Sequence, residues 1–279
     1  MARYNRILIT GAEGNLGREL RRGLADLAEH IRINDRIEMT NVTAKEEPVV
    51  AELGDLEAVL EMTRDVDAIV HFGGAPMEMA FETILNDTIR GTYHVYEAAR
   101  RNGVKRIIYA SSVHAIGFYP LEDHIDASAP PRPDGLYGVS KAYVEALSRL
   151  YWDKWGIETF CLRIFSSFEE PADRRHLWSF LTFDDLVRYV SAALTAPRVG
   201  HTIGFGLSDN TVKPVDDRLA AHIGCVPKDS AEPHRARIEA ATEPSDPTAL
   251  QYARLGGFIV EMDHPDDWDA PPETPGAKK

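Results

Sequence analysis

The feature that most constrains the fold is a short apolar run that leads into a glycine-rich turn. The run Arg6–Thr10 is apolar and β-branched, which is typical of a strand buried in a parallel sheet. Leucines at a helical spacing follow the turn. Glycine allows backbone N–H groups and the positive end of a helix to approach a pyrophosphate. We therefore predict a dinucleotide site at this turn, formed by Gly11, Gly14, Asn15, Leu16 and Gly17.

An acidic residue stands at the end of the next predicted strand. This strand is His30–Asn34, and Asp35 follows it about twenty residues after the glycines. A carboxylate there accepts hydrogen bonds from a ribose 2′-OH and repels a 2′-phosphate, which favours NAD over NADP. Arg36 leaves NADP open as an alternative. A simple tight turn with a solvated strand end is the weaker interpretation, because strand, turn, helix, strand and acid follow in the expected order.

The rest of the chain alternates between strand and helix patterns. We predict further strands at 49–53, 68–72, 106–110, 158–164 and 201–205, and helices at 55–63, 81–101, 137–155 and 183–196. This order predicts an α/β protein with a Rossmann-type doubly wound parallel sheet and a small C-terminal substrate-binding appendage.

One domain is expected over residues 1–263. We place substrate-binding insertions mainly in 165–182 and 206–263, and predict that 264–279 is a mobile tail or a partner-binding arm. The proline-rich, acidic stretch Pro120–Asp134 is expected to be a loop that crosses the front of the site.

Tyr137 and Lys141 are the strongest candidates for catalysis. They are four residues apart in a predicted helix, so both lie on one face, about one turn apart. A tyrosine ordinarily has a pKa near ~10, and a nearby ammonium group lowers it toward the range where general-base catalysis is efficient. Ser112 ends an apolar strand and is placed to hold the reacting hydroxyl. The alternative, a packed tyrosine with a solvated lysine, explains the five-residue pattern alone equally well.

Composition excludes several classes of partner. The net charge of -13 argues against nucleic acid and anionic membranes, because both attract clustered Lys and Arg. Two cysteines, Cys161 and Cys225, are too few for a disulfide framework or an obvious zinc site, so we expect no metal. The start of the chain lacks the apolar region of a signal peptide, and no apolar run approaches the ~20 residues of a membrane span. A soluble, cytoplasmic protein is expected.

These motifs together resemble the extended short-chain dehydrogenase/reductase superfamily, of the NAD-dependent epimerase/dehydratase type. The resemblance rests on Gly11-x-x-Gly14-x-x-Gly17, Asp35, Ser112 and Tyr137-x-x-x-Lys141 in this order. Longer stretches are similar to the bacterial uronate dehydrogenase family: 71–74, 110–120, 132–141, 163–166 and 224–229. That family oxidises the anomeric carbon of glucuronate or galacturonate with NAD and forms a lactone.

The resemblance implies roles for individual residues. Tyr137 would be the base, Ser112 would orient the hydroxyl, and Lys141 would lower the phenol pKa and hold the nicotinamide ribose. The cofactor would also meet Glu52, Leu53, Phe72, Gly73, Gly74 and Ile164. The substrate would meet Ala75, Pro76, Ser111, Val113, His114, Ser166 and Arg175, with Arg175 holding a carboxylate. Packing of His114 and solvation of Arg175 are the alternatives for those two.

The chain also departs from the family pattern. Pro76 and Val113 replace a serine and an asparagine, and Phe165 replaces a glycine, which makes the predicted pocket less polar. Three functions remain open: a uronate dehydrogenase, a dehydrogenase of another acidic sugar or a less polar hydroxy compound, and a weakly catalytic NAD-sensing protein. We expect a small-molecule substrate, an acidic sugar, and a homo-oligomer built on the helices at 81–101 and 137–155.

Overall fold

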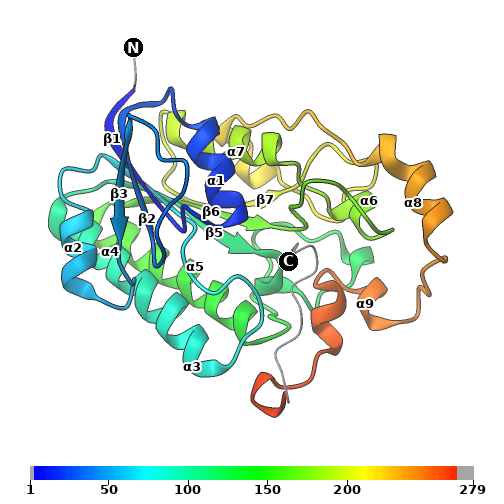
Figure 1. Cartoon of the computed structure of the whole chain (residues 1–279). Helices are drawn as coiled ribbons and strands as arrows, with labels where there is room; N and C mark the ends of the chain where they lie inside the picture. The colour runs from blue at the N-terminus through cyan, green and yellow to red at the C-terminus, as the bar shows by residue number, and fades with distance from the viewer. Residues whose placement is uncertain (1–2, 269–279) are drawn as a thin grey trace.

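A seven-stranded parallel sheet organises the computed structural model, which describes residues 3–268. The strand order is β3-β2-β1-β4-β5-β6-β7 (Figure 1). The strands are β1 (Tyr4–Thr10), β2 (Ala28–Asp35), β3 (Glu46–Val50), β4 (Ala68–His71), β5 (Arg106–Ser112), β6 (Glu158–Ile164) and β7 (His201–Gly206). The order reverses between β1 and β4, and this switch point opens a crevice at the carboxyl ends of the strands. The predicted Rossmann-type doubly wound sheet is confirmed.

Helices cover both faces of the sheet. The helices near the sheet are α1 (Asn15–Gly23), α2 (Leu56–Met62), α4 (Gly91–Asn102), α5 (Leu136–Trp155) and α7 (Phe183–Thr195). Helices α1 and α7 lie together on one face, while α2, α4 and α5 lie on the other (Figure 1). Both faces are therefore shielded from water, as an all-parallel sheet requires.

The two faces have separate apolar cores because successive side chains of a strand point to opposite sides. In β1, Ile7 and Ile9 pack with Leu20 of α1, whereas Leu8 between them packs with Val95 of α4. All of these side chains are fully buried. This explains why the first predicted strand reads as a continuous apolar run rather than an alternating one.

The third strand lies three residues earlier than predicted. It spans Glu46–Val50, at the edge of the sheet, and pairs with β2 on one side. An edge strand tolerates Pro48, because proline lacks only the N–H that a second neighbour would need. Residues 51 and 52 instead lead into a turn at Leu53 and Gly54, which places Glu52 and Leu53 beside the crevice.

The stretch 81–101 is helical, but its middle is not a regular α-helix. A short α3 (Phe81–Thr83) continues into π-helical turns, η1 (Ile84–Arg90), before α4 begins at Gly91. On these turns the hydroxyl of Thr88 accepts a hydrogen bond from the backbone N–H of Ala75 at 3.1 Å. Such π turns are often found near functional sites, and a helical period alone does not reveal them.

Residues 120–134 do not line the cavity, which differs from the predicted position of this loop across the front of the site. The loop contains η3 (Leu121–Asp123) and folds back along η2 (Val113–Ile116) and the residues after it. Backbone hydrogen bonds join Phe118 to Arg132 and Arg132 to Ala115, at 3.1 and 3.0 Å. These bonds join the loop to η2 and the residues after it, and its last residue, Asp134, contacts the cavity residue His114.

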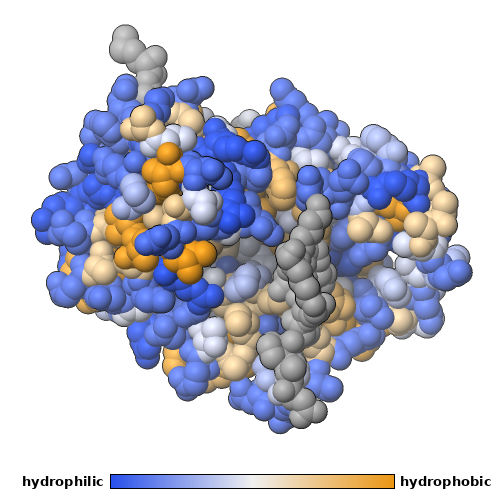
Figure 2. All heavy atoms as spheres, in the orientation of Figure 1, coloured by the Kyte–Doolittle hydropathy of each residue, from blue (hydrophilic) through white to orange (hydrophobic). Residues whose placement is uncertain are grey.

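After β7 the described chain contains only short helices. They are η4 (Arg218–Ile223), η5 (Glu232–His234), α8 (Arg235–Ala241), α9 (Leu250–Ala253), η6 (Gly257–Glu261) and η7 (Pro265–Asp267). A further short helix, α6 (His176–Ser179), lies between β6 and α7. Most of the tail predicted at 264–279 lies outside the described residues; within them, Pro265 is buried. No helix among residues 3–268 has the length and apolarity that crossing a membrane requires. Figure 2 shows a mainly hydrophilic face, with some apolar residues gathered near β2 and β3.

Candidate active site

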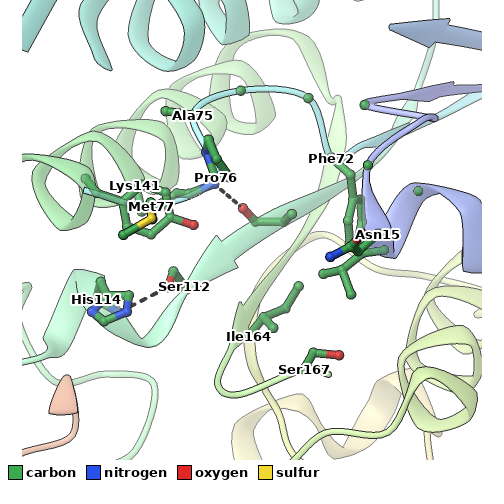
Figure 3. A pocket seen from close by; sticks show the side chains of 18 of the residues that line it. Asn15, Phe72, Ala75, Pro76, Met77, Ser112, His114, Lys141, Ile164 and Ser167 are labelled. Atoms are coloured by element: carbon green, nitrogen blue, oxygen red, sulfur yellow. Dashed lines mark hydrogen bonds between the residues drawn. The ribbon is translucent and has the colours of Figure 1, made fainter. Parts of the chain in front are cut away.

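A cavity of about 640 Å³ lies at the carboxyl ends of the strands. Every residue predicted from the sequence for the site lines this cavity: Gly11, Gly14, Asn15, Leu16, Gly17, Asp35, Glu52, Leu53, Phe72, Gly73, Gly74, Ala75, Pro76, Ser111, Ser112, Val113, His114, Tyr137, Lys141, Ile164, Ser166 and Arg175. Figure 3 shows Asn15 and Phe72 on one side of it, and Ser112, His114 and Lys141 on the other. The cavity therefore has a glycine-rich half and a half with titratable groups.

The glycine-rich half is a cradle that side chains would fill. Gly11 has a φ of +68°, and a Cβ atom there would lie 2.7 Å from the backbone carbonyl of Phe72. A Cβ atom on Gly17 would lie 2.0 Å from the carbonyl oxygen of Gly11. Gly14 is the N-cap of α1 and offers no capping side chain to the first turn. Backbone N–H groups are thus available to a pyrophosphate, and the residues present fit a dinucleotide.

Asp35 is held in place at the end of β2. One carboxylate oxygen accepts the backbone N–H of Glu13 at 2.9 Å, and the other accepts that of Arg36 at 2.8 Å. The carboxylate is therefore fixed next to the glycine turn, in the part of the cavity where a carboxylate selects against a 2′-phosphate.

Glu13 stabilises this arrangement, a role that the sequence analysis missed. Its buried carboxylate accepts hydrogen bonds from Arg21 at 3.0 Å and from the hydroxyl of Thr40 at 2.6 Å. Burial alone would raise the pKa of this carboxyl, but hydrogen bonds from Thr40 and Arg18 hold it below its usual range. The network joins the glycine turn to the segment after β2. The signal in the sequence was a charged residue, Glu13, between two glycines of the turn.

Tyr137 and Lys141 lie on α5 with Ser112 opposite them, at the end of β5. The Lys141 Nζ atom is 5.0 Å from the centre of the Tyr137 ring and donates to the carbonyl of Ala110 at 2.7 Å. Ser112 is buried, and its hydroxyl accepts the backbone N–H of His114 at 3.3 Å (Figure 3). Close packing of α5 on η2 brings these groups together, since a Cβ on Gly138 would lie 2.2 Å from the His114 carbonyl oxygen.

Burial shifts the pKa of both groups on α5 strongly. It raises the pKa of Tyr137 to about 12; hydrogen bonding with Ser112 opposes this shift, and the charge of Asp134 adds to it. Burial lowers the pKa of Lys141 to about 7, against the opposing influence of Glu145. The predicted lowering of the Tyr137 pKa by Lys141 is therefore not seen: burial dominates, and the pKa of Tyr137 moves upward, away from the range of a base at neutral pH.

A buried ion pair supports the strands beneath this site. Glu145 accepts hydrogen bonds from Ser111 at 2.6 Å and from Arg163 at 2.8 and 2.9 Å. It therefore joins α5 to the ends of β5 and β6. The hydroxyl of Ser111 is therefore directed at Glu145 rather than at a substrate, and it helps to hold the end of β5 against α5.

Arg175 lines the cavity together with Ser166. Its guanidinium donates to the hydroxyl of Ser166 at 2.6 Å and to the carbonyl of Leu255 at 2.7 Å, while Nε is buried beside Gly257 without a hydrogen-bond partner. Burial lowers the pKa of Arg175 to about 10. The charges of Asp173 and Asp134 oppose this shift, although neither forms an ion pair with Arg175 among residues 3–268. The unpartnered Nε–H is the group left for an anion.

His114 is oriented by an aspartate. Its Nδ1 atom lies 2.9 Å from a carboxylate oxygen of Asp134, which is buried. The His114 ring meets the Tyr137 ring edge-on, with centroids 5.7 Å apart. When Nδ1 carries the proton, Nε2 is left as an acceptor for a substrate hydroxyl.

The three residues that depart from the family pattern, Pro76, Val113 and Phe165, all line the cavity. Pro76 is exposed on the cavity wall, whereas Val113 and Phe165 are buried in one apolar cluster with Ile116 and Phe205. This cluster also contains Leu255, so it connects the site to the C-terminal segment.

Residues of the C-terminal segment form a further wall; the sequence analysis placed a substrate-binding insertion over 206–263 but named none of these residues. Gly256, Phe258 and Ile259 line the cavity. They are brought there by hydrogen bonds from Leu255 to Tyr119 and from Gly256 to Gly117, at 3.0 and 2.9 Å. An aromatic residue after two glycines was the only local signal. Among the described residues, no cluster of His, Cys, Asp and Glu side chains could hold a metal ion.

Known proteins with similar sequences cover nearly the whole chain. The model of the NAD dependent epimerase/dehydratase family matches residues 7–172. A uronate dehydrogenase from Pseudomonas putida is 48% identical over 258 residues, which are 92% of this chain and 96% of that protein.

Solved structures agree with this result. The structure of a glucuronic acid dehydrogenase from Chromohalobacter salexigens superposes with a TM-score of 0.93 at 41% identity, covering 95% of this chain and 99% of that one. A uronate dehydrogenase from Agrobacterium tumefaciens, a tyrosine-to-alanine mutant complexed with NAD, superposes with a TM-score of 0.90 at 41% identity. The shared coverage is 93% of this chain and 98% of that one.

Proposed function

Because the chain belongs to the NAD-dependent epimerase/dehydratase family, we propose that it is an NAD-dependent dehydrogenase that oxidises a uronate at its anomeric hydroxyl, giving a lactone. The observation that carries this proposal is the pairing of two features in one cavity. Tyr137, Lys141 and Ser112 supply a base beside the glycine cradle, and Arg175 supplies a buried guanidinium with an unpartnered N–H. The first feature suits removal of a hydroxyl proton, and the second suits a substrate carboxylate.

The residues of the chain divide the reaction between them. Ser112 hydrogen-bonds the anomeric hydroxyl, and Tyr137 removes its proton. Lys141 stabilises the phenolate form of Tyr137 when it is charged. Gly11 to Gly17 and Asp35 would hold NAD, which would supply the acceptor for the hydride from the anomeric carbon. With the proton and the hydride both removed, the C–O single bond becomes the lactone carbonyl.

At the other end of the substrate, Arg175 would hold the carboxylate. The guanidinium is already oriented by Ser166 and Leu255, so little conformational freedom is lost on binding. His114 and Ser166 would contact ring hydroxyls. Glu52, Leu53, Phe72, Gly73, Gly74 and Ile164 would pack around the cofactor, with Ala75 and Pro76 at its boundary with the substrate.

The apolar wall supports a second candidate. Pro76, Val113 and Phe165 provide few hydrogen bonds to a sugar, which favours an acidic substrate with fewer hydroxyl groups. A weakly catalytic NAD-sensing protein is the third candidate, and measured turnover separates it from the other two.

A steady-state assay with purified protein tests the proposal. NAD is combined in turn with glucuronate, galacturonate, glucose, galactose and glucose bearing a sulfonate, and the ultraviolet absorbance of NADH is followed. We expect turnover of the uronates and much weaker turnover of the neutral sugars. NAD binding without turnover of either uronate would contradict the proposed substrate and favour the second or third candidate.

We also propose that the protein is a cytoplasmic homo-oligomer. Both cysteines, Cys161 and Cys225, are free, which suits a reducing compartment. Large side chains are exposed along α4 and α5: Tyr93, Val139, Tyr143, Leu150 and Trp155. Light scattering coupled to size-exclusion chromatography is expected to give twice the chain mass of 31.1 kDa. A monomer at micromolar concentration would contradict this assembly.

A further inference from the structure

The helix that carries Tyr137 is capped by a carboxylate from a distant part of the chain. The side chain of Glu78 is buried, at 3% exposure, and accepts two backbone hydrogen bonds from the first turn of α5. One oxygen accepts the N–H of Leu136 at 2.8 Å, and the other accepts the N–H of Tyr137 itself at 2.9 Å. The first N–H groups of a helix have no partner within the helix, and they favour negative charge.

The usual source of such a cap is absent at this helix. Gly135 occupies the N-cap position and has no side chain that could accept these hydrogen bonds. Glu78 takes over this role from 58 residues away. A cap supplied from elsewhere in the fold does more than stabilise a helix, because it also fixes the helix relative to the segment that supplies it.

That segment is a wall of the cavity. Glu78 directly follows Ala75, Pro76 and Met77, all of which line the cavity. The side chains of Ala75 and Tyr137 also belong to one apolar cluster with Ile84. The wall beside the substrate and the base that acts on the substrate are therefore joined through Glu78.

The carboxylate of Glu78 also occupies the space that a side chain at position 135 would need. A Cβ atom at Gly135 would lie 2.2 Å from Oε2 of Glu78, 2.7 Å from its Cδ and 3.1 Å from its Oε1. The backbone of Gly135 is extended, with a φ of -169° and a ψ of 179°, a conformation that any residue adopts. Glu78 thus supplies the three nearest obstacles to a side chain at position 135.

We propose that Glu78 is a positioning residue, which holds Tyr137 at the correct distance from the substrate wall by capping α5. The turnover part of its test depends on the proposed uronate oxidation. An error in the position of a reacting group of about 1 Å costs up to about a hundredfold in rate, so a shift of α5 is expected to reduce kcat.

Two different substitutions disturb this contact. Glu78→Ala removes the carboxylate, whereas Gly135→Ala keeps it and displaces it with a methyl group. Each is expected to lower kcat for glucuronate about tenfold, to change KM less than about threefold, and to leave the Kd of NAD unchanged. Glu78→Gln should be intermediate, because its amide oxygen still accepts one N–H. Glu82→Ala, an exposed carboxylate four residues further on, is the matched control and should behave as wild type.

The double variant Glu78→Ala with Gly135→Ala decides whether the two effects have one cause. Without the carboxylate, the methyl group has no obstacle, so the double variant should have the kcat of Glu78→Ala alone. If kcat of the double variant fell by the product of the two single-variant factors, the proposal would be overturned. Wild-type kcat in both single variants would overturn it as well. If Glu78→Ala does not fold, Gly135→Ala and Glu78→Gln still give the comparison with the control.

Amide hydrogen exchange provides a readout that needs no substrate. Both single variants should speed exchange at the amides of Leu136 and Tyr137 at least about tenfold, while the amides of β1 keep their wild-type rates. Unchanged exchange at these two amides would overturn the cap regardless of substrate. If wild-type protein does not oxidise glucuronate but the exchange result holds, the proposed function fails and the cap stands.

Discussion

The ammonium group of Lys141 lies 5.0 Å from the centre of the Tyr137 ring, one turn along the same helix. Both groups are buried, and burial disfavours the charged form of each. A charged Lys141 lowers the cost of forming a phenolate at Tyr137, and a phenolate lowers the cost of charging Lys141. Each group thus makes the charged form of the other more accessible, which is the electrostatic basis for the proposed base.

Removal of the phenol oxygen tests the base. Tyr137→Phe is expected to lower kcat by at least about a thousandfold, because it removes the oxygen that takes the hydroxyl proton in the proposed mechanism. The Kd of NAD, measured by titration calorimetry, should change little. Tyr143→Phe, an exposed tyrosine on the same helix, is the control. Retained turnover in Tyr137→Phe would rule out this mechanism.

Replacement of Arg175 tests recognition of a carboxylate. Arg175→Ala is expected to raise KM for glucuronate about 10- to 100-fold, the range for loss of a charged hydrogen bond, and to affect glucose much less. The comparison of KM for the two sugars is the measurement.

The neighbouring arginine provides the control. Arg174 donates to the backbone carbonyls of Glu239, Thr242 and Glu243, and it does not line the cavity. Arg174→Ala should therefore leave KM unchanged. An equal effect of Arg175→Ala on both sugars would show that Arg175 does not bind a carboxylate.

Asp35 is expected to determine the choice between NAD and NADP. Asp35→Ala removes the charge that would repel a 2′-phosphate, so the ratio of kcat/KM for NAD to that for NADP should fall at least about tenfold. Asp26→Ala, which removes a fully exposed carboxylate, is the control for net charge. An unaltered ratio in Asp35→Ala would assign the selectivity to another group.

Lys141 makes stability depend on pH. Its pKa is about 7 in the folded chain, against an ordinary value of 10.5. Between these values the unfolded chain binds more protons than the folded chain, so the free energy of unfolding rises with pH. From pH 7 to pH 9 this contribution amounts to about 2 kcal/mol.

Lys141→Met removes this contribution. Urea unfolding at the two pH values should show a smaller rise for the variant than for wild type, by about 2 kcal/mol. Lys154→Met, an exposed lysine on the same helix, should keep the wild-type rise. The same rise in Lys141→Met as in wild type would mean that Lys141 is not shifted downward.

Much of the fold follows from local patterns in the sequence. The buried strand before Gly11, the leucine stripe after it and the acid at Asp35 identify a Rossmann-type sheet, because they reflect the periods of a strand and a helix. The positions of Tyr137 and Lys141 on one helix face are local in the same sense. Parallel strands all carry their carboxyl ends to one edge, and for this reason the predicted site residues meet in one cavity.

Tertiary structure alone decided which distant segments complete that cavity. The cap from Glu78 on α5 spans 58 residues, and the contact of Arg175 with Leu255 spans 80. The loop 120–134 lies outside the cavity lining and is bonded to residues outside its own segment. The π turns before Gly91 likewise contact α5, which is distant in the sequence. Periodicity records only which face of an element is buried. It does not record which segment covers that face, because apolar contact is non-directional and a backbone N–H donates to any suitably placed carboxylate.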